Sequence, residues 1–505
     1  LIVGNPPWIK LEWHEEAVLG DKNPVLIVKD YKAAQINPIR KDLLDDPLTY
    51  LLYFSEYESI TGQQCFLNAI QNYPLLKGQQ TNLFKCFLPN AWYFGGKQAV
   101  SAFVHPDGIY DDPKGGIFRA EAYKRLRQHV QYENELGLFE GTNDHGRLRF
   151  STNIYRNGTK GYRFDTINNM FSPSTIDECY EEASSSTVPG IKDDQGNWSV
   201  TGHPDRIIHI REQELKLFGQ LFDGSDEWKT ARLPVLHAKQ LVEVLEEFVE
   251  QKKTLGQLGD RISTNEMWHE VNRQKDGTII RDVHFPENIY DFVFSGPHIG
   301  NGNPLFKASR TICVFNGDYD VIDLTNIPDD YLQRCNYRPN VPLEEYSRRA
   351  PIGLNNQKAF SGYRVVWRSM LNQSGERTMM PVITPPHTGH VDLVFEFVGD
   401  NRINSIVAST FASLPFDFYI KATGKAHARL DVIQNMPYLE DSQYTEKIIT
   451  RGLLLNSLTK HYAELWKDQF NEAFTKDLWS KTDPRLLPTR FITLTPTWTW
   501  DTPLR

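Results

Sequence analysis

Short apolar runs alternate with helix-period segments over the first 160 residues. The runs 1–3, 99–104 and 150–155 predict strands, and the segments 82–94 and 118–132 predict helices. Strands that alternate with helices are typical of an α/β fold with a doubly wound sheet. The first run reads as the end of a buried strand, so we expect residues 1–160 to be a domain that is incomplete at its N-terminus.

The pattern changes after residue 160. Residues 161–233 lack a clear period and predict a linker or an insertion, whereas 234–253 predict a helix with Leu236, Leu241 and Leu245 near one face. Glycine, proline and asparagine separate short β-branched or aromatic runs up to residue 440, which indicates an α+β domain over 234–440. A helix over 442–474 dominates the predicted C-terminal segment, 441–505.

Composition and charge narrow the class of protein. The 505 residues are 40% hydrophobic and 24% charged, and no apolar run is long enough for a membrane helix. The five cysteines are scattered without a Cys-x-x-Cys pair, so we expect a reducing, cytoplasmic setting. A net charge of −9 argues against indiscriminate coating of nucleic acid, although a local basic cleft stays compatible with it.

The residues with the clearest chemical meaning follow the first apolar run: Gly4, Asn5, Pro6, Pro7 and Trp8. Two prolines hold the backbone extended, so we expect the Asn5 amide and the Pro6 carbonyl to face a cleft as two hydrogen-bond acceptors. Two acceptors can hold an exocyclic amine and free its lone pair for methylation, while Trp8 stacks on a flat base for about 1–3 kcal/mol. An ordinary proline turn is the alternative interpretation.

This motif resembles the fourth motif of the amino-methyltransferases that modify adenine in DNA. Residues 81–85 resemble the family's next motif, 95–108 resemble the glycine turn, strand and loop after it, and Phe139 stands where the family often has a second aromatic. The resemblance implies the C-terminal half of a Rossmann-like methyltransferase domain, with Asn5, Pro6, Pro7 and Trp8 catalytic and with Trp8 and Phe139 stacking on a flipped adenine. It also implies the cofactor S-adenosylmethionine, whose main binding motif is not in this chain.

The second domain resembles the target-recognition domains of type IIG restriction-modification enzymes and of type I specificity subunits, over 294–304 and 416–438. The whole chain is most similar to the adenine methylases of DISARM and BREX phage-defence systems. Double-stranded DNA and other defence-system subunits are therefore the expected partners. The expected DNA-binding residues are His298, Asn301, Asn303, Lys307, Arg310, Lys421, Lys425, His427 and Arg429. A glycine-rich hairpin without a ligand and a solvated basic loop are the alternatives.

Other chemistry is less well supported. His387 and His390 are a close histidine pair with only Asp392 as a nearby carboxylate, so we expect no metal site. Asp107, Glu121 and Lys124 do not have the spacing of a metal nuclease. Two hypotheses compete with a DNA adenine methyltransferase: a DNA-specificity subunit without catalysis, and a methyltransferase that acts on a protein glutamine.

Overall fold

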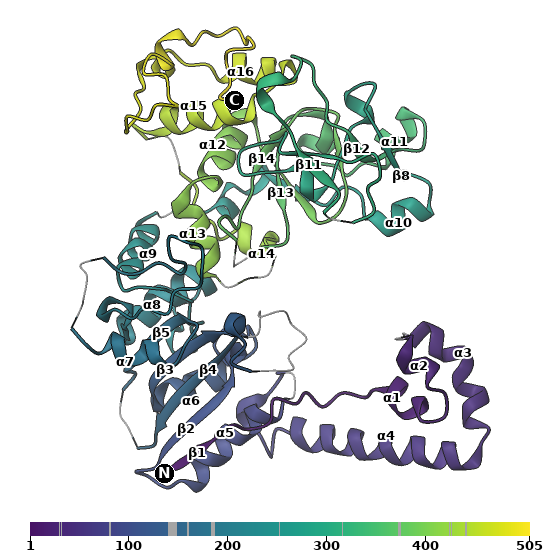
Figure 1. The fold of residues 1–505 in the computed structure, drawn as a ribbon, viewed down its shortest axis with the longest axis vertical. Coiled ribbons are helices and arrows are strands. Elements are labelled where there is room, and N and C mark those ends of the chain that lie inside the picture. The colour runs from purple at the N-terminus through teal and green to yellow at the C-terminus, as the bar shows by residue number, and fades with distance from the viewer. Residues whose placement is uncertain are drawn as a thin grey trace. The chain divides into compact units, whose positions relative to one another are not determined.

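The chain divides into two compact units. The computed structural model describes residues 1–29, 31, 33–79, 82–139, 149–158, 161–182, 187–251, 253–315, 317–371, 375–423, 425, 427–439 and 442–505. The first unit is Leu1–Glu246 and the second is Glu247–Arg505 (Figure 1). Among the described helices, none combines the length and hydropathy needed to cross a bilayer.

A mixed six-stranded sheet forms the centre of the first unit. Its order is β1 (Ile2–Gly4), β2 (Val100–Pro106), β4 (Arg149–Arg156), β3 (Leu126–Glu133), β5 (Phe164–Met170) and β6 (Ile208–Ile210). β1 runs parallel to β2 and β3 runs parallel to β5, while β4 is antiparallel to both β2 and β3. The carboxyl ends of β1, β2, β3 and β5 therefore meet at one edge of the sheet, together with the start of β4.

Besides the helical segment described next, the first unit contains α5 (Leu83–Phe94), α6 (Gly116–Arg125), α7 (Ser174–Cys179) and α8 (Glu212–Phe218), and α9 (Gln240–Glu250) crosses the unit boundary. Asn82 caps α5 because its side chain accepts a hydrogen bond from the Phe84 amide. The predicted strands 1–3, 99–104 and 150–155 and the predicted helix 82–94 are confirmed, within one or two residues at their ends.

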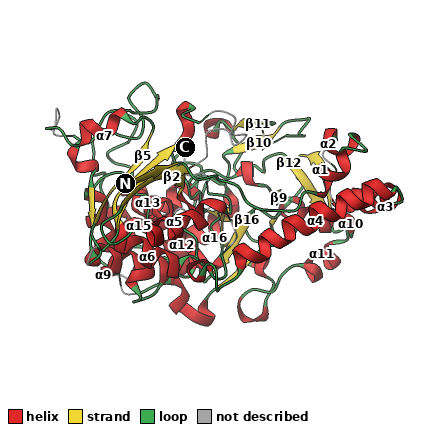
Figure 2. Cartoon of the chain, turned by 90° about the horizontal axis from the view of Figure 1, so that it is seen from below, coloured by secondary structure: helices red, strands yellow, loops and turns green. Residues whose placement is uncertain are grey.

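A helical segment lies between β1 and α5. It comprises α1 (Glu15–Gly20), α2 (Val25–Val28), α3 (Ala33–Leu44) and the long α4 (Pro47–Asn68), visible beside α3 in Figure 2. Its small core contains Leu19, Leu26, Ile36 and Tyr53. The Tyr53 hydroxyl donates to Glu15 (2.7 Å), and Arg40 pairs with the same carboxylate. These contacts join the first and last helices of the segment.

Two predictions for the first unit are wrong. The expected helix over 118–132 ends at Arg125, and Leu126 already begins β3. Residues 161–233, expected as a linker, contain β5 and β6 of the sheet. β5 was hidden in the sequence because an interior strand buries both faces and lacks alternation, whereas β6 is a three-residue edge strand, too short for a recognisable pattern. β5 also buries polar side chains, Thr166 and Asn168, which no apolar pattern reveals.

The second unit is α+β. Its largest sheet has the order β14 (Val382–Thr384), β13 (Arg364–Arg368), β16 (Val394–Val398), β7 (Ser263–Asn265), and is antiparallel throughout. Three strand pairs accompany it: β8 (Ile279–His284) with β12 (Cys335–Pro339), β10 (Lys307–Ser309) with β11 (Tyr319–Val321), and β9 (Val293–Phe294) with β15 (Gly389–His390).

The helices of the second unit are α10 (Glu270–Lys275), α11 (Leu343–Arg349), α12 (Asn401–Phe411), α13 (Leu414–Ala422), α14 (Leu430–Ile433), α15 (Thr445–Asn456) and α16 (Ala463–Gln469). The helix predicted over 442–474 is therefore two helices, because Ser457 leaves the helical conformation at ψ 51°. The helix predicted over 234–253 is shorter and begins at Gln240.

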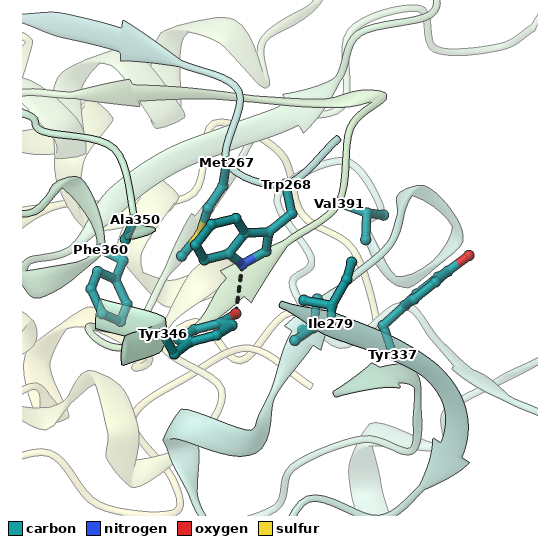
Figure 3. Packing of buried hydrophobic residues seen from close by; sticks show 9 residues of the cluster. Met267, Trp268, Ile279, Tyr337, Tyr346, Ala350, Phe360 and Val391 are labelled. Carbon is teal, nitrogen blue, oxygen red and sulfur yellow. Dashed lines mark hydrogen bonds between the residues drawn. The ribbon is translucent and has the colours of Figure 1, made fainter. Parts of the chain in front are cut away.

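One aromatic cluster fixes part of the second unit (Figure 3). The Trp268 indole N–H donates to the Tyr346 hydroxyl (2.6 Å), and both side chains are fully buried. Gly389 passes so close that a Cβ there would lie 2.3 Å from that hydroxyl. Only glycine therefore lets β15 approach this pair.

Candidate active site at the carboxyl edge of the first sheet

The loop Asn5–Trp8 lies at the carboxyl end of β1, where ligands of parallel α/β sheets usually bind. Pro6 is buried and Asn5 is exposed. Among the described residues, no side chain or backbone group hydrogen-bonds to the Asn5 amide. The sequence-predicted acceptor is therefore free to meet a ligand.

Trp8 lies in a cluster of aromatic rings. Its indole N–H donates to the Val104 carbonyl (3.4 Å), which ties the loop to β2. The Trp8 ring centre is 5.0 Å from that of Phe139 and 5.9 Å from that of Phe150, at the start of β4. Phe139 and Phe150 meet edge to face at 4.7 Å. The structure thus brings the two predicted stacking residues together, in direct contact and without a gap for a base between them.

Asn134 positions Phe139. Its side-chain amide donates to the Phe139 carbonyl (2.9 Å), and its side-chain oxygen accepts from the Phe139 amide (2.9 Å). Asn134 is only 4% exposed and directly follows β3. Gly137, at φ 68°, gives the intervening turn the left-handed conformation that brings the chain back. Sequence reasoning missed Asn134, because an asparagine after a strand is common.

A chain of buried polar side chains runs beneath this edge. The Asp107 carboxylate lies 2.8 Å from His129 Nε2, and His129 Nδ1 lies 2.8 Å from the Thr166 hydroxyl. Thr166 donates to Asn168 (3.3 Å), whose amide donates to the Leu236 carbonyl (3.0 Å). Burial raises the pKa of Asp107, but the neighbouring His129 outweighs it and the pKa is lowered. This chain connects β2, β3 and β5.

His105 packs behind the same loops as a neutral side chain. It is fully buried, it lies 3.0 Å from the Tyr155 hydroxyl, and burial lowers its pKa to about 4. Its ring stacks on Phe84 of α5 at 5.3 Å. The motif segment 95–108 therefore contributes packing on one side of the edge and the Asp107 carboxylate on the other. Thr81, in the motif segment 81–85, lies outside the described residues.

Several predicted DNA-binding residues are part of the interior of the second unit. His298 is fully buried, lies 3.2 Å from the Ser309 hydroxyl, and burial lowers its pKa to about 3. Asn301 donates to the Ala412 carbonyl (3.2 Å), and Asn303 accepts from the Leu305 amide (2.9 Å). These hydrogen bonds shape a loop, and His298 is not presented to any ligand in this structure.

The predicted basic residues are distributed over two places. Lys307 and Arg310 lie on or next to β10, and Arg310 is exposed. The Lys421 ammonium donates to the Gly375 carbonyl (2.8 Å), and Lys425 and His427 are half-buried. Among the described cations of residues 421–429, Arg429 is exposed. The structure therefore separates the predicted set into Lys307 with Arg310, and Arg429 with its half-buried neighbours.

The histidine pair has protein partners. His390 Nε2 lies 3.1 Å from Glu396, which also pairs with Arg364 at 3.2 Å, and all three are buried. His387 stacks on Tyr290 at 4.6 Å. Within the part of the chain that the structure describes, no group of three histidine, cysteine or acidic side chains could hold a metal ion.

Comparison with known proteins gives partial similarities. No protein-family model matches the chain, and no curated protein matches it. Similar solved structures include the type IIG restriction endonuclease BpuSI (13% identity, TM-score 0.28), with 80% of this chain and 48% of that chain covered. The type IIL restriction-modification enzyme MmeI in complex with DNA has 7% identity and TM-score 0.36, with 81% and 48% covered.

The ATP-dependent type ISP restriction-modification enzyme LlaBIII bound to DNA has 10% identity and TM-score 0.29, with 91% of this chain and 29% of that chain covered. All three neighbours are restriction or restriction-modification enzymes, and this chain spans about half of the first two. TM-scores below 0.5 do not establish a shared fold, so function has to be judged from this chain's own residues.

Proposed function

We propose that this chain is part of a site-specific DNA adenine methyltransferase of a restriction-modification or phage-defence system. The observation that carries the proposal is the Asn5–Trp8 loop at the carboxyl end of a parallel strand, with an exposed Asn5 and with Trp8 in an aromatic cluster. The second unit, with its exposed basic residues, would recognise the DNA.

The proposed reaction takes place on a flipped base. An adenine amine is inaccessible inside the stacked duplex, so the target nucleotide has to leave it. The Asn5 side-chain oxygen and the Pro6 carbonyl accept hydrogen bonds from the two amine N–H groups and draw the nitrogen toward tetrahedral geometry. The freed lone pair would take a methyl group from a bound sulfonium donor as the donor's carbon–sulfur bond breaks, and the cationic amine would then release a proton without a strong base. Because Trp8 and Phe139 touch each other, the base either separates them or stacks on the free side of one ring.

The methyl donor in this proposal is S-adenosylmethionine. The described loops at the carboxyl edge supply Asn5, Asp107 and Asn134, and none of them is a glycine-rich turn of the kind that binds such a cofactor. These residues alone do not fit the donor. The steps assigned to this chain are therefore only the holding of the amine and the stacking of the base.

The test is modification-sensitive sequencing of DNA from a host that expresses the full protein, beside Asn5→Ala and Trp8→Ala variants. We expect methylated adenine in one recurring sequence motif with the unchanged protein and its loss in both variants. DNA binding measured in parallel should persist in Asn5→Ala, because Asn5 contacts only the flipped base.

The alternative function is a specificity subunit without catalysis. It is favoured if methylation persists at full level in Asn5→Ala, or if expressed protein binds DNA in one sequence context and leaves it unmodified. Absence of DNA binding together with methylation of a protein glutamine would favour the remaining hypothesis.

A further inference from the structure

A hairpin of the second unit exposes an apolar tip. β10 (Lys307–Ser309) and β11 (Tyr319–Val321) are joined by residues 310–318, of which residue 316 lies outside the described part. Ile312 is 77% exposed, Val314 56% and Phe315 74%. We call these three side chains the hairpin tip. Large apolar side chains gathered on the surface usually mark a contact with another molecule.

The tip is held in one conformation. The Asp318 carboxylate accepts hydrogen bonds from the Val314 amide (2.9 Å) and the Phe315 amide (2.7 Å), and these bonds lower the pKa of Asp318. Arg281, on the neighbouring β8, donates to the carbonyls of Cys313 (3.1 Å) and Val314 (3.0 Å). These hydrogen bonds fix the backbone of the loop, and the three apolar side chains of the tip stay exposed on it.

Four cations lie on the hairpin or contact it: Lys307 and Arg310 belong to it, and Arg281 and Arg334 reach it from outside. Arg334 reaches the hairpin through the Ser309 carbonyl (2.6 Å) and the Thr311 hydroxyl (3.1 Å). The carboxylates on the hairpin are Asp318, which holds the loop, and Asp320, which pairs with Arg310 (2.9 Å). Lys307 and Arg310 therefore balance Asp318 and Asp320 on the hairpin itself, and the positive charge beside it comes from Arg281 and Arg334.

An apolar tip with two arginines, Arg281 and Arg334, beside it fits duplex DNA. Arginine and lysine neutralise the phosphates on both sides of a groove, while an apolar side chain can enter between two base pairs and unstack them. We propose that the hairpin tip inserts into DNA as a wedge and unstacks a base step when the second unit binds. This inference rests on the proposed function, because it assumes that DNA is the ligand of the second unit.

The experiment compares the unchanged full chain, the double variant Ile312→Ser with Phe315→Ser, and the control Ile492→Ser. Ile492 is another exposed isoleucine of the second unit, with 67% exposure. Relaxed closed-circular plasmid is treated with topoisomerase I in the presence of each protein, and the topoisomers are resolved after the protein is removed. Plasmid affinity is measured in parallel by fluorescence anisotropy. Neither readout requires the recognised sequence to be known.

A wedge unwinds DNA, so the unchanged chain and Ile492→Ser should shift the linking number. The double variant should lose the shift while its Kd changes by less than about threefold, because phosphate contacts supply most of the affinity. Equal shifts in all three proteins, or no shift with any of them despite binding, would overturn the wedge and leave the proposed function standing. Failure of the unchanged chain to bind DNA would overturn both.

A membrane-binding loop has the same apolar and cationic composition, so one arm uses vesicles of phosphatidylcholine and phosphatidylglycerol. Co-sedimentation of the unchanged chain and loss of it in the double variant, without any effect on plasmid topology, would assign the tip to a lipid surface and overturn the wedge. No co-sedimentation, together with the topological difference, supports DNA.

Discussion

The two hydrogen bonds between the Asn134 side chain and the Phe139 backbone, here called the clamp, lead to a prediction that can be tested at one amide. Asn134→Ala removes both hydrogen bonds of 2.9 Å, from the Asn134 amide to the Phe139 carbonyl and from the Phe139 amide to Asn134. Each bond contributes about 0.5–1.5 kcal/mol net, so together they hold the loop by about 1–3 kcal/mol. If local opening governs exchange, the Phe139 amide should exchange hydrogen roughly 5–150-fold faster in the variant.

The assay is hydrogen exchange with mass spectrometry and electron-transfer fragmentation, which isolates the Phe139 amide. Asn134→Asp is the matched control, because a carboxylate keeps the acceptor for this amide and loses only the donor to the Phe139 carbonyl. Its exchange rate should fall between those of the unchanged protein and Asn134→Ala. Identical rates in the unchanged protein and Asn134→Ala would refute the clamp. In methylation assays Asn134→Ala should raise KM more than it lowers kcat, because the loop that carries one stacking ring is released.

Two further predictions concern buried charge in the second unit. Glu396→Gln leaves Arg364 buried without an anionic partner, and this loss should lower the stability of the second unit by about 3–5 kcal/mol. The loss should be measurable as faster hydrogen exchange in β16. Burial raises the pKa of Glu396, but Arg364 and His390 outweigh it and the pKa is lowered from its ordinary value of 4.5. The difference in stability between the unchanged protein and Glu396→Gln should therefore be largest above pH 4.5 and should shrink below it. A difference in stability that grows on acidification would contradict this. Burial lowers the pKa of His298 from 6.5 to about 3. Between these pH values the unfolded chain binds a proton at His298 and the folded unit does not. The free energy of unfolding should therefore fall by about 1.4 kcal/mol for each pH unit of acidification. In urea titrations His298→Gln should make this dependence on pH less steep.

The sequence predicts secondary structure well where a capping residue or a proline marks the end of an element. Asn82 before an apolar helical run correctly marks the start of α5, and the alternation in 99–104 marks β2. The loop Asn5–Trp8 is found at a strand end, as expected, because a short apolar run followed by two prolines leaves the chain few conformations. These local signals need no knowledge of distant residues.

Long-range contacts account for what the sequence did not reveal. Arg125 and Leu126 separate a helix from a strand without glycine or proline, and only pairing of β3 with β4 and β5 decides the change. His298 was predicted to contact DNA because histidine and asparagine in a glycine-rich loop can read bases. Its full burial depends on Ser309, eleven residues away. The role of Asn134 depends on the turn that brings Phe139 back within hydrogen-bond distance of its side chain.

The polar hydrogen bonds act together with the apolar cluster around Val130, Phe150 and Ile167 to shape the carboxyl edge. A buried Asp107, His129 or Thr166 would each be costly if unpaired, so their hydrogen bonds allow few alternative arrangements of the strands. Asp107 begins the loop after β2, and His129 lies on β3, the strand that leads to Asn134 and Phe139. Trp8 bonds to β2 through the Val104 carbonyl. Hydrogen bonds thus tie the loops after β1 and β2 to the strands beside them, and Asn5 of the first loop is exposed.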